Sequence, residues 1–253
     1  MKVSESRVQI MVAGVQKSGT TALAKFLTEH PRLGLSKKKE IHFFDRNDLY
    51  LNGNEDAIHS YHEEFDGCVG DIWCDATPAY CYFPEAVERI YRYNPEAKLI
   101  MALRNPVERA YSHYVMMREF GLEKLPFSAA VKLESERIGP RPWEDLDGPA
   151  RNFNYVDRGR YARMLEDLWN RFPREQTLIL LQDDLLDQHE ATLSKVWDFL
   201  GVEHVPVAPA KHFSTAYDRP MSEAARNYVQ ATLADQILQT GHLLGRNLSG
   251  WLN

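Results

Sequence analysis

Residues 8–22 join an apolar run to a glycine-containing turn and then to a helical pattern. Such a turn exposes backbone N–H groups at a helix N-terminus, where a phosphate or sulfate binds readily. Gly14 and Gly19 have the G-x4-G spacing of the loop that holds nucleotide phosphates in many ATP-binding proteins. That loop continues with Lys and then Ser or Thr, whereas this chain has two threonines there and places its lysine earlier, as Lys17. We therefore expect an anion-binding loop that is not built for ATP and Mg²⁺.

Apolar runs alternate with helical patterns along the rest of the chain, which predicts a parallel sheet with helices on both faces. No repeat or linker divides the 253 residues, so we expect a single domain over 1–253. The predicted strands cover 8–14, 69–74, 98–104 and 177–182. The predicted helices cover 20–29, 55–65, 84–93, 106–120, 127–137, 157–172, 190–200 and 222–238. The irregular stretch 138–152 is predicted to be a mobile surface loop.

Composition limits the class of protein. Hydrophobic residues make up 44% and charged residues 26%, which is ordinary for a globular domain. The net charge of -6 lacks the basic footprint of a nucleic-acid-binding protein. The apolar run at the start is too short to span a membrane and lacks the layout of a secretory signal. We expect a cytoplasmic enzyme with no nucleic-acid or membrane partner; the sequence does not indicate its oligomeric state.

The turn after the first strand is the first candidate site. Backbone N–H groups of residues 17–22, ending at Ala22, would surround an anion, with hydroxyls from Ser18, Thr20 and Thr21 and the charge of Lys17. The alternative is an ordinary helix start, capped by a hydroxyl side chain, with the lysine in solvent. Ligands of parallel α/β sheets bind beyond the carboxyl ends of the strands, which favours the binding site.

A second candidate follows the strand predicted at 98–104. Arg104 lies at the end of that strand and Ser112 lies in the helix after it, so both can reach one phosphate. Arginine fits a phosphate through two parallel hydrogen bonds. The alternative is that Arg104 caps the sheet edge or pairs with Glu108.

The third candidate is the segment from Lys39 to Asp45. If it is extended, Glu40 and His42 share one face while Ile41 and Phe43 share the other. A carboxylate beside an imidazole near an anion site is a plausible general base. The alternative is a half-buried edge strand whose polar face is solvated.

Together, these segments resemble the sulfotransferases that use 3'-phosphoadenosine 5'-phosphosulfate (PAPS), especially the heparan sulfate type and bacterial small-molecule relatives. The likeness runs through QKSGTTAL, KEIHFFD, DATPAY, NPEAKLIMALRNPVERAYSHY, YARMLEDLWNRFP and LLGRNLSGWL. It implies a three-layer α/β/α fold with a central parallel sheet, related to the P-loop nucleotide kinases. It also implies transfer of a sulfuryl group from PAPS, with adenosine 3',5'-bisphosphate as product and no metal requirement.

The resemblance assigns roles residue by residue. Glu40 matches the catalytic base, and His42 and Asp45 match neighbours that shape the site. Arg104 and Ser112 would hold the 3'-phosphate, which selects this donor over ATP. The 5'-phosphosulfate would be held by Lys17, which also stabilises the leaving group, and by Ser18, Gly19, Thr20, Thr21 and Ala22.

One departure concerns the acceptor. Heparan sulfate enzymes usually carry Glu-Lys where this chain has Asp75 and Ala76. The missing lysine removes a cation, and the net charge of -6 would repel a polyanion. We therefore expect a hydroxyl or amine of a small-molecule or saccharide acceptor. Aromatic residues around 73–83 and 143–155 would line an acceptor pocket or belong to the core.

Two further points stay open from sequence. The donor-binding loop expected late in the chain lacks its usual motif, so Lys211, Arg219 or neither would reach the nucleotide. The competing functions are a P-loop nucleotide kinase or NTPase, which needs the lysine that Thr20 replaces, and a non-catalytic nucleotide-binding protein.

Overall fold

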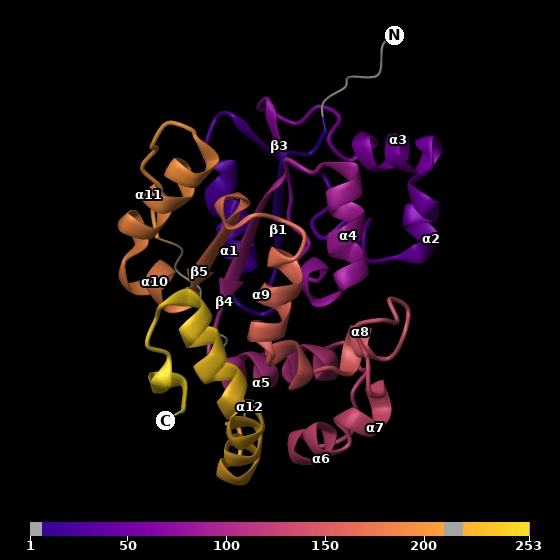
Figure 1. Cartoon of the computed structure of the whole chain (residues 1–253), viewed down its shortest axis with the longest axis vertical. Helices are drawn as coiled ribbons and strands as arrows, with labels where there is room; N and C mark the ends of the chain where they lie inside the picture. Colours follow the sequence, from indigo (N-terminus) through magenta and orange to yellow (C-terminus); the bar gives the residue numbers. More distant parts are fainter. Residues whose placement is uncertain (1–6, 210–219, 253) are drawn as a thin grey trace.

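The sheet at the centre of the fold has five parallel strands in the order β2-β3-β1-β4-β5 (Figure 1). The computed structural model describes residues 7–209 and 220–252. The strands are β1 (Ile10–Gly14), β2 (Leu33–Leu35), β3 (Ile72–Asp75), β4 (Lys98–Leu103) and β5 (Thr177–Leu181). Strand β1 is central, and the chain crosses from its β3 side to its β4 side, so a crevice opens between the carboxyl ends of β1 and β4.

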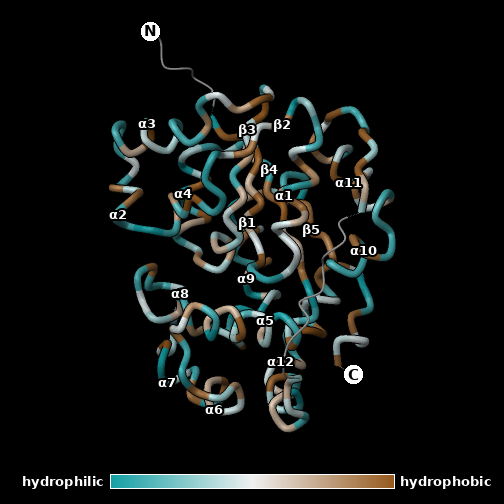
Figure 2. The backbone as a smooth tube through the Cα atoms, turned by 180° about the vertical axis from the view of Figure 1, so that it is seen from behind, coloured by the Kyte–Doolittle hydropathy of each residue, from teal (hydrophilic) through white to brown (hydrophobic). Residues whose placement is uncertain are grey.

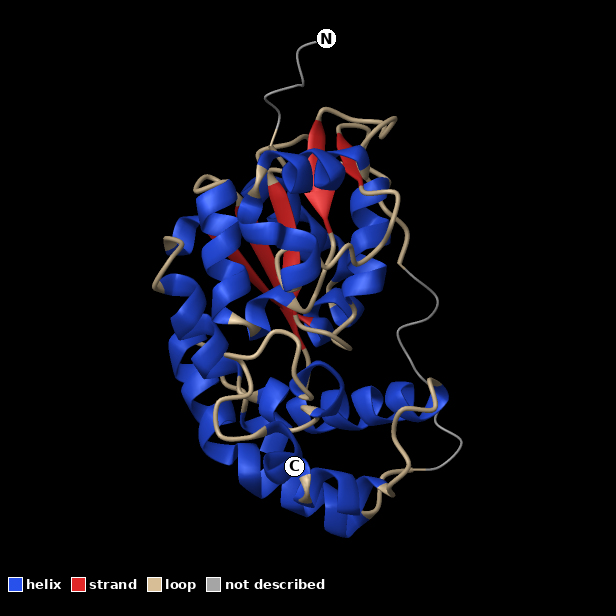
Figure 3. Ribbon diagram, turned by 90° about the vertical axis from the view of Figure 1, so that its right-hand side faces the viewer, coloured by secondary structure: helices blue, strands red, loops and turns tan. Residues whose placement is uncertain are grey.

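Helices cover both faces of the sheet. Ile10 and Val12 pack in one core with α1 (Thr20–Thr28), α10 (Gln182–Asp187) and α11 (His189–Leu200). Met11 and Ala13 point to the opposite face, where α3 (Glu55–Glu63), α4 (Pro84–Tyr93) and α9 (Tyr161–Trp169) pack. Burial on both faces explains why the strands read as continuous apolar runs, brown at the centre of Figure 2. Figure 3 shows the sheet between its helices and confirms the predicted three-layer α/β/α class.

A second group of helices extends the molecule on one side of the sheet, in the lower half of Figure 1. The long helix α12 packs against α9, α5 and α6. This group comprises α5 (Pro106–Glu119), α6 (Phe127–Lys132), α7 (Glu134–Ile138), α8 (Ala150–Phe153) and α12 (Glu223–Leu244), while α2 (Asn47–Tyr50) lies near α3. None of the helices among residues 7–209 and 220–252 has the length and apolarity needed to cross a bilayer.

The secondary structure differs from the prediction in places where the sequence signal is short. The three residues of β2 include Gly34 and give no readable period, so this strand was not predicted. Helix α10 follows β5 without a connecting loop and was also not predicted. The predicted helix at 127–137 is two short helices, the one at 157–172 opens with a 3-10 turn, and α12 extends beyond 238. The irregular stretch 138–152 includes the start of α8.

Candidate active site

The turn after β1 leaves the start of α1 uncapped. Gly19 occupies the N-cap position with φ 87°, in the left-handed region that glycine tolerates best, and no side chain caps the helix there. The alternative of a hydroxyl-capped helix start is therefore wrong. An uncapped helix start leaves backbone N–H groups for an anion, and the positive end of the helix dipole favours its charge.

The three segments singled out from sequence meet at one cleft. Its volume is about 220 Å³, and it lies between the turn after β1, the end of β4 with the middle of α5, and the segment around Glu40. The lining residues are Gln16, Lys17, Gly19, Thr20, Thr21, Ala22, Lys39, Glu40, Pro78, Arg104, Ser112, Met116 and Gln182. One ligand can therefore contact the turn, Arg104 and Glu40 together.

Ser18 does not line this cleft. Its side chain is fully buried, and its backbone N–H donates to the carbonyl of Val15 at 3.1 Å. The hydroxyl lies beneath the turn, near Tyr161. Ser18 thus packs behind the anion loop, and the loop residues that reach the cleft are Lys17 and residues 19–22.

Lys17 and Arg104 lie together on the floor of the cleft. Lys17 has φ 71°, and its Nζ lies 3.7 Å from the sulfur of Met116 on α5. Burial lowers the pKa of Lys17, and the charge of Arg104 lowers it further, against the carboxylates of Glu119 and Glu40, which raise it. Arg104 donates to the carbonyl of Lys17 at 3.4 Å, so it also supports the turn.

Glu108, the alternative partner of Arg104, pairs with a different arginine. Glu108 pairs with Arg226 of α12 at 2.6 Å, so the alternative of an Arg104–Glu108 pair is wrong. Arg104 instead lines the cleft together with Ser112, two turns into α5. The carbonyl of Arg104 accepts a hydrogen bond from the hydroxyl of Tyr161 at 2.9 Å, which fixes the end of β4. The guanidinium lines the cleft while one of its nitrogens donates to the carbonyl of Lys17.

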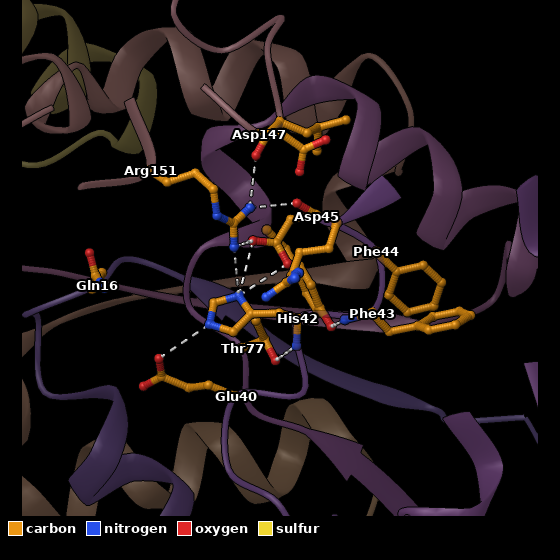
Figure 4. Close-up of polar contacts among 12 residues, drawn as sticks. Gln16, Glu40, His42, Phe43, Phe44, Asp45, Thr77, Asp147 and Arg151 are labelled. Carbon is orange, nitrogen blue, oxygen red and sulfur yellow. Dashed lines mark hydrogen bonds and ion pairs between the residues drawn. The ribbon is translucent and has the colours of Figure 1, made fainter. Parts of the chain in front are cut away.

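The segment around Glu40 is not a strand. Glu40 and His42 both have φ 59°, in the left-handed region, so the predicted extended conformation and the edge-strand alternative are wrong. The alternation of sides holds nevertheless: Ile41 and Phe43 are buried, and the Nε2 of His42 lies 3.8 Å from Glu40 Oε2. The kinked backbone therefore brings the carboxylate and the imidazole together as predicted (Figure 4).

Lys39 connects Glu40 to the anion loop. Its Nζ lies 3.0 Å from Glu40 Oε1 and donates to the hydroxyl of Thr21 at 2.7 Å. From sequence, Lys39 was the first residue of the third candidate segment and had no role of its own. Its contact with a loop 18 residues away could not be read from local pattern.

Arg151, on α8, completes a polar network behind Glu40 (Figure 4). The Nδ1 of His42 lies 3.0 Å from Asp45 Oδ2, and Arg151 Nη2 lies 3.1 Å from the same oxygen. Burial alone would raise the pKa of Asp45, but the hydrogen bond and charge of His42 and the charge of Arg151 lower it below its usual value. Arg151 was missed from sequence, because it lies 106 residues from Asp45 in an irregular stretch.

The other sequence expectations have mixed outcomes. Tyr80, Tyr82 and Phe83 are fully buried, so these aromatic residues of 73–83 belong to the core, as does Tyr155. Lys211 and Arg219 lie outside the described residues. Within residues 7–209 and 220–252, no group of three or more His, Cys, Asp or Glu side chains is placed to hold a metal ion.

The chain matches known proteins over nearly its whole length. The model of the "Sulfotransferase domain" family matches residues 7–236. Heparan sulfate glucosamine 3-O-sulfotransferase 6 of Mus musculus is 32% identical over 81% of this chain and 55% of its own length. This chain therefore spans about half the length of that curated relative, at 55%.

Two solved structures show the same fold. A sulfotransferase from Alicyclobacillus acidocaldarius superimposes with a TM-score of 0.81 at 27% identity, covering 98% of this chain and 100% of that one. Mouse sulfotransferase SULT7A1, solved in complex with PAP, has a TM-score of 0.52 at 15% identity, with 79% of this chain and 62% of that one covered. At that identity the second likeness concerns the fold alone.

Proposed function

Because this chain belongs to the sulfotransferase family, we propose that it transfers a sulfuryl group from PAPS to a hydroxyl or amine of a small-molecule or saccharide acceptor. One observation supports this most directly. The uncapped start of α1, Lys17, Arg104 and Glu40 all face a single cleft at the carboxyl ends of β1 and β4. A base, an anion loop and a second basic group are the parts that such a transfer needs.

The residues present suit the two charged ends of the donor. The backbone N–H groups of residues 19–21 and the hydroxyls of Thr20 and Thr21, with Lys17, would hold the 5'-phosphosulfate. Ala22 lines the cleft beside them, and its N–H donates to the carbonyl of Gly19 at 3.0 Å. Arg104 and Ser112 would hold the 3'-phosphate, which ATP lacks. The contribution of the late segment that contains Lys211 and Arg219 stays a prediction.

Glu40 would act as the general base. Its carboxylate takes the proton of the acceptor O–H or N–H as the new bond to sulfur forms and the bond from sulfur to the bridging oxygen breaks. Lys17 stabilises the negative charge that develops on the leaving phosphate. Lys39, whose Nζ lies 3.0 Å from Glu40 Oε1 and donates to Thr21, holds this carboxylate beside the anion loop. The Nδ1 of His42 is hydrogen-bonded to Asp45, and its Nε2 lies 3.8 Å from the second carboxylate oxygen of Glu40.

The acceptor that we propose carries little negative charge. Ala76 stands where the heparan sulfate enzymes usually have lysine, and its side chain is buried beside the sheet. Arg151, whose Nη2 lies 3.4 Å from His42 Nδ1, is paired with Asp45. Since a sulfated polysaccharide needs unpaired cations, a neutral small molecule or a weakly charged saccharide suits this site better.

Sulfate transfer from PAPS tests the proposal. The purified protein is incubated with PAPS and a panel of hydroxylated and aminated small molecules and saccharides, heparan sulfate included, and sulfated products are detected by mass. Calorimetry with adenosine 3',5'-bisphosphate and ATP runs in parallel. We expect binding of the bisphosphate in preference to ATP and transfer to an uncharged acceptor. Preferential ATP binding with phosphate transfer would identify a kinase instead. The cytoplasmic location stays a prediction.

A further inference from the structure

A buried carboxylate lies beneath the segment that holds Glu40. Asp75, at the end of β3, is fully buried and accepts three hydrogen bonds from hydroxyl groups. Thr77 donates to Oδ1 at 2.7 Å, while Tyr80 and Tyr61 donate to Oδ2 at 2.7 Å and 3.0 Å. Nothing in the proposed reaction uses this group, so its place under the site calls for a separate explanation.

The three hydroxyl groups differ in which backbone N–H groups their oxygens contact. Each has one hydrogen and gives it to the carboxylate, so its oxygen is left with lone pairs that can only accept. The oxygen of Thr77 lies 3.5 Å from the backbone nitrogen of His42, a contact drawn in Figure 4. The oxygen of Tyr80 accepts the next backbone N–H, that of Phe43, at 3.2 Å. Residues 40–43 form the catalytic segment. Two consecutive N–H groups of this segment are thus linked to one carboxylate through two hydroxyl groups.

This segment needs such support. Glu40 and His42 both adopt the left-handed backbone conformation, which is uncommon for side chains of this size. An uncommon conformation persists only where the surrounding structure holds it. One N–H group belongs to His42, the second of the two left-handed residues, and the other to Phe43, the next residue. Holding these two groups therefore restrains the direction in which the Glu40 and His42 side chains leave the backbone.

We propose that Asp75 is a positioning residue, which acts through Thr77 and Tyr80 to hold the backbone at residues 42–43 and thereby directs Glu40 and His42 toward the cleft. The inference rests on the function proposed above for Glu40. Tyr61 provides the contrast within the same network. It donates to the same carboxylate oxygen as Tyr80 and is equally buried, but its hydroxyl contacts no N–H of the catalytic segment among the bonds described.

The matched variants are Tyr80→Phe and Tyr61→Phe. Each removes one hydroxyl from Asp75 and keeps the ring, so a purely structural role predicts similar losses of stability and activity. A positioning role predicts that Tyr80→Phe lowers kcat about 10- to 100-fold, because small misplacements of a catalytic group are costly. Tyr61→Phe then stays within about threefold of the unchanged protein. The Kd for adenosine 3',5'-bisphosphate stays the same in both, because the anion loop is not touched.

Two variants of Thr77 test the second contact between Asp75 and the backbone, the one through the Thr77 hydroxyl. Thr77→Val removes the hydroxyl at nearly constant shape and should lower kcat by a similar factor, whereas Thr77→Ser keeps the hydroxyl and should restore it. Equal kcat in Thr77→Val and Thr77→Ser, or equal losses in the two tyrosine variants, would overturn the inference.

Hydrogen–deuterium exchange separates this inference from the proposed function. We expect faster exchange at the amides of His42 and Phe43 in Tyr80→Phe and Thr77→Val, and unchanged exchange in Tyr61→Phe. If the unchanged protein transfers no sulfate from PAPS but the three variants show this exchange pattern, the proposed function fails, and the role of Asp75 in holding the backbone at residues 42–43 stands. If it transfers sulfate and the exchange of all variants is the same, the positioning role fails and the function stands.

Discussion

At the scale of single residues, the cleft separates a base from the groups that bind the donor. Glu40 is half-buried and lies between Lys39 and His42, while Lys17 and Arg104 lie on the loop and strand end opposite. A change at the base should therefore alter turnover, and a change at the strand end should alter donor affinity.

Replacing Glu40 by Gln keeps the shape of the side chain and removes its capacity to take a proton. We expect kcat to fall by about 10²- to 10⁴-fold, the usual contribution of a positioned base, with little change in the Kd for adenosine 3',5'-bisphosphate. Glu119→Gln is the control, since Glu119 also acts electrostatically on Lys17 but does not line the cleft. Its kcat should stay within about threefold. Normal turnover of Glu40→Gln would remove Glu40 from the role of base.

Replacing Arg104 by Ala tests recognition of the 3'-phosphate. We expect the affinity for adenosine 3',5'-bisphosphate to fall about 10- to 100-fold, since a charge-assisted hydrogen bond contributes about 1.5–3 kcal/mol. Adenosine 5'-monophosphate lacks the 3'-phosphate, so its affinity should change much less. Arg118→Ala, on α5 but outside the cleft lining, serves as control. Calorimetry gives the six dissociation constants of the unchanged protein and the two variants; equal losses of affinity for both nucleotides in Arg104→Ala would mean that Arg104 only supports the turn.

Residue-level prediction from sequence succeeded where a local pattern encodes chemistry. The anion loop and Arg104 each follow a strand, and they line one cleft together with Ser112 and Glu40 from the other segments singled out from sequence. The roles of these residues stay a prediction. Arg151 and Lys39 were missed as site residues because their contacts join segments far apart in the chain. The pairing of Glu40 with His42 was predicted from an extended backbone, but it arises from a left-handed one.

At the scale of elements, α8 supplies Arg151 to the polar network of His42 and Asp45, which lie more than 100 residues earlier in the chain. Arg151 donates to the carbonyl groups of Asp45 at 2.6 Å and Leu146 at 2.9 Å, and so ties the irregular stretch 138–152 to the catalytic segment. A periodic pattern could not predict this, because α8 has only four residues. Whether the stretch 138–152 moves during turnover stays a prediction.

Arg151→Met keeps the length of the side chain and removes its charge. Asp45 would then stay buried with the hydrogen bond of His42 and the charge of Arg158 but without its ion pair, so we expect a loss of about 2–3 kcal/mol in the free energy of unfolding. Turnover should fall about 10-fold or more as His42 loses its orientation. Arg141→Met is the control within the same stretch, because its pair with Glu144 is exposed and worth at most about 1 kcal/mol. Urea unfolding and kcat are measured for both; similar losses in the two variants would contradict the argument.

At the scale of the whole molecule, the two cores share the strands of one sheet. Alternate residues of β1 belong to opposite cores, so neither face can form without the other. The alternation of strands and helices made this layering predictable, because a parallel sheet must be covered on both faces. The short strand β2 was not predictable, since it adds at the edge by pairing with β3 and its own three residues give no period. A single domain over 1–253 stays a prediction.

Buried carboxylates also make the stability of the whole molecule depend on pH, with opposite signs at two neighbouring sites. Burial raises the pKa of Asp75 from 3.8 to about 6, although its three hydroxyl donors act against the shift. Between these values the folded chain holds a proton that the unfolded chain has lost, so this group stabilises less as the pH rises. Asp45 has a lowered pKa, so its contribution is lost as the pH falls through that lowered value.

Replacing Asp75 by Asn tests whether this carboxyl stabilises the folded protein less as the pH rises. The free energy of unfolding is measured in urea for the unchanged protein and for Asp75→Asn from about pH 4 to about pH 7, and the variant is subtracted so that other groups cancel. The difference should fall by about 3 kcal/mol as the pH rises to about 6, at 1.36 kcal/mol for each pKa unit, and then level off. Asp45→Asn should give the opposite slope at the acid end. A constant difference for Asp75→Asn would mean that folding does not shift the pKa of this carboxylate. A falling one would show that its charge costs stability at neutral pH, as expected of a group retained to hold its neighbours in place.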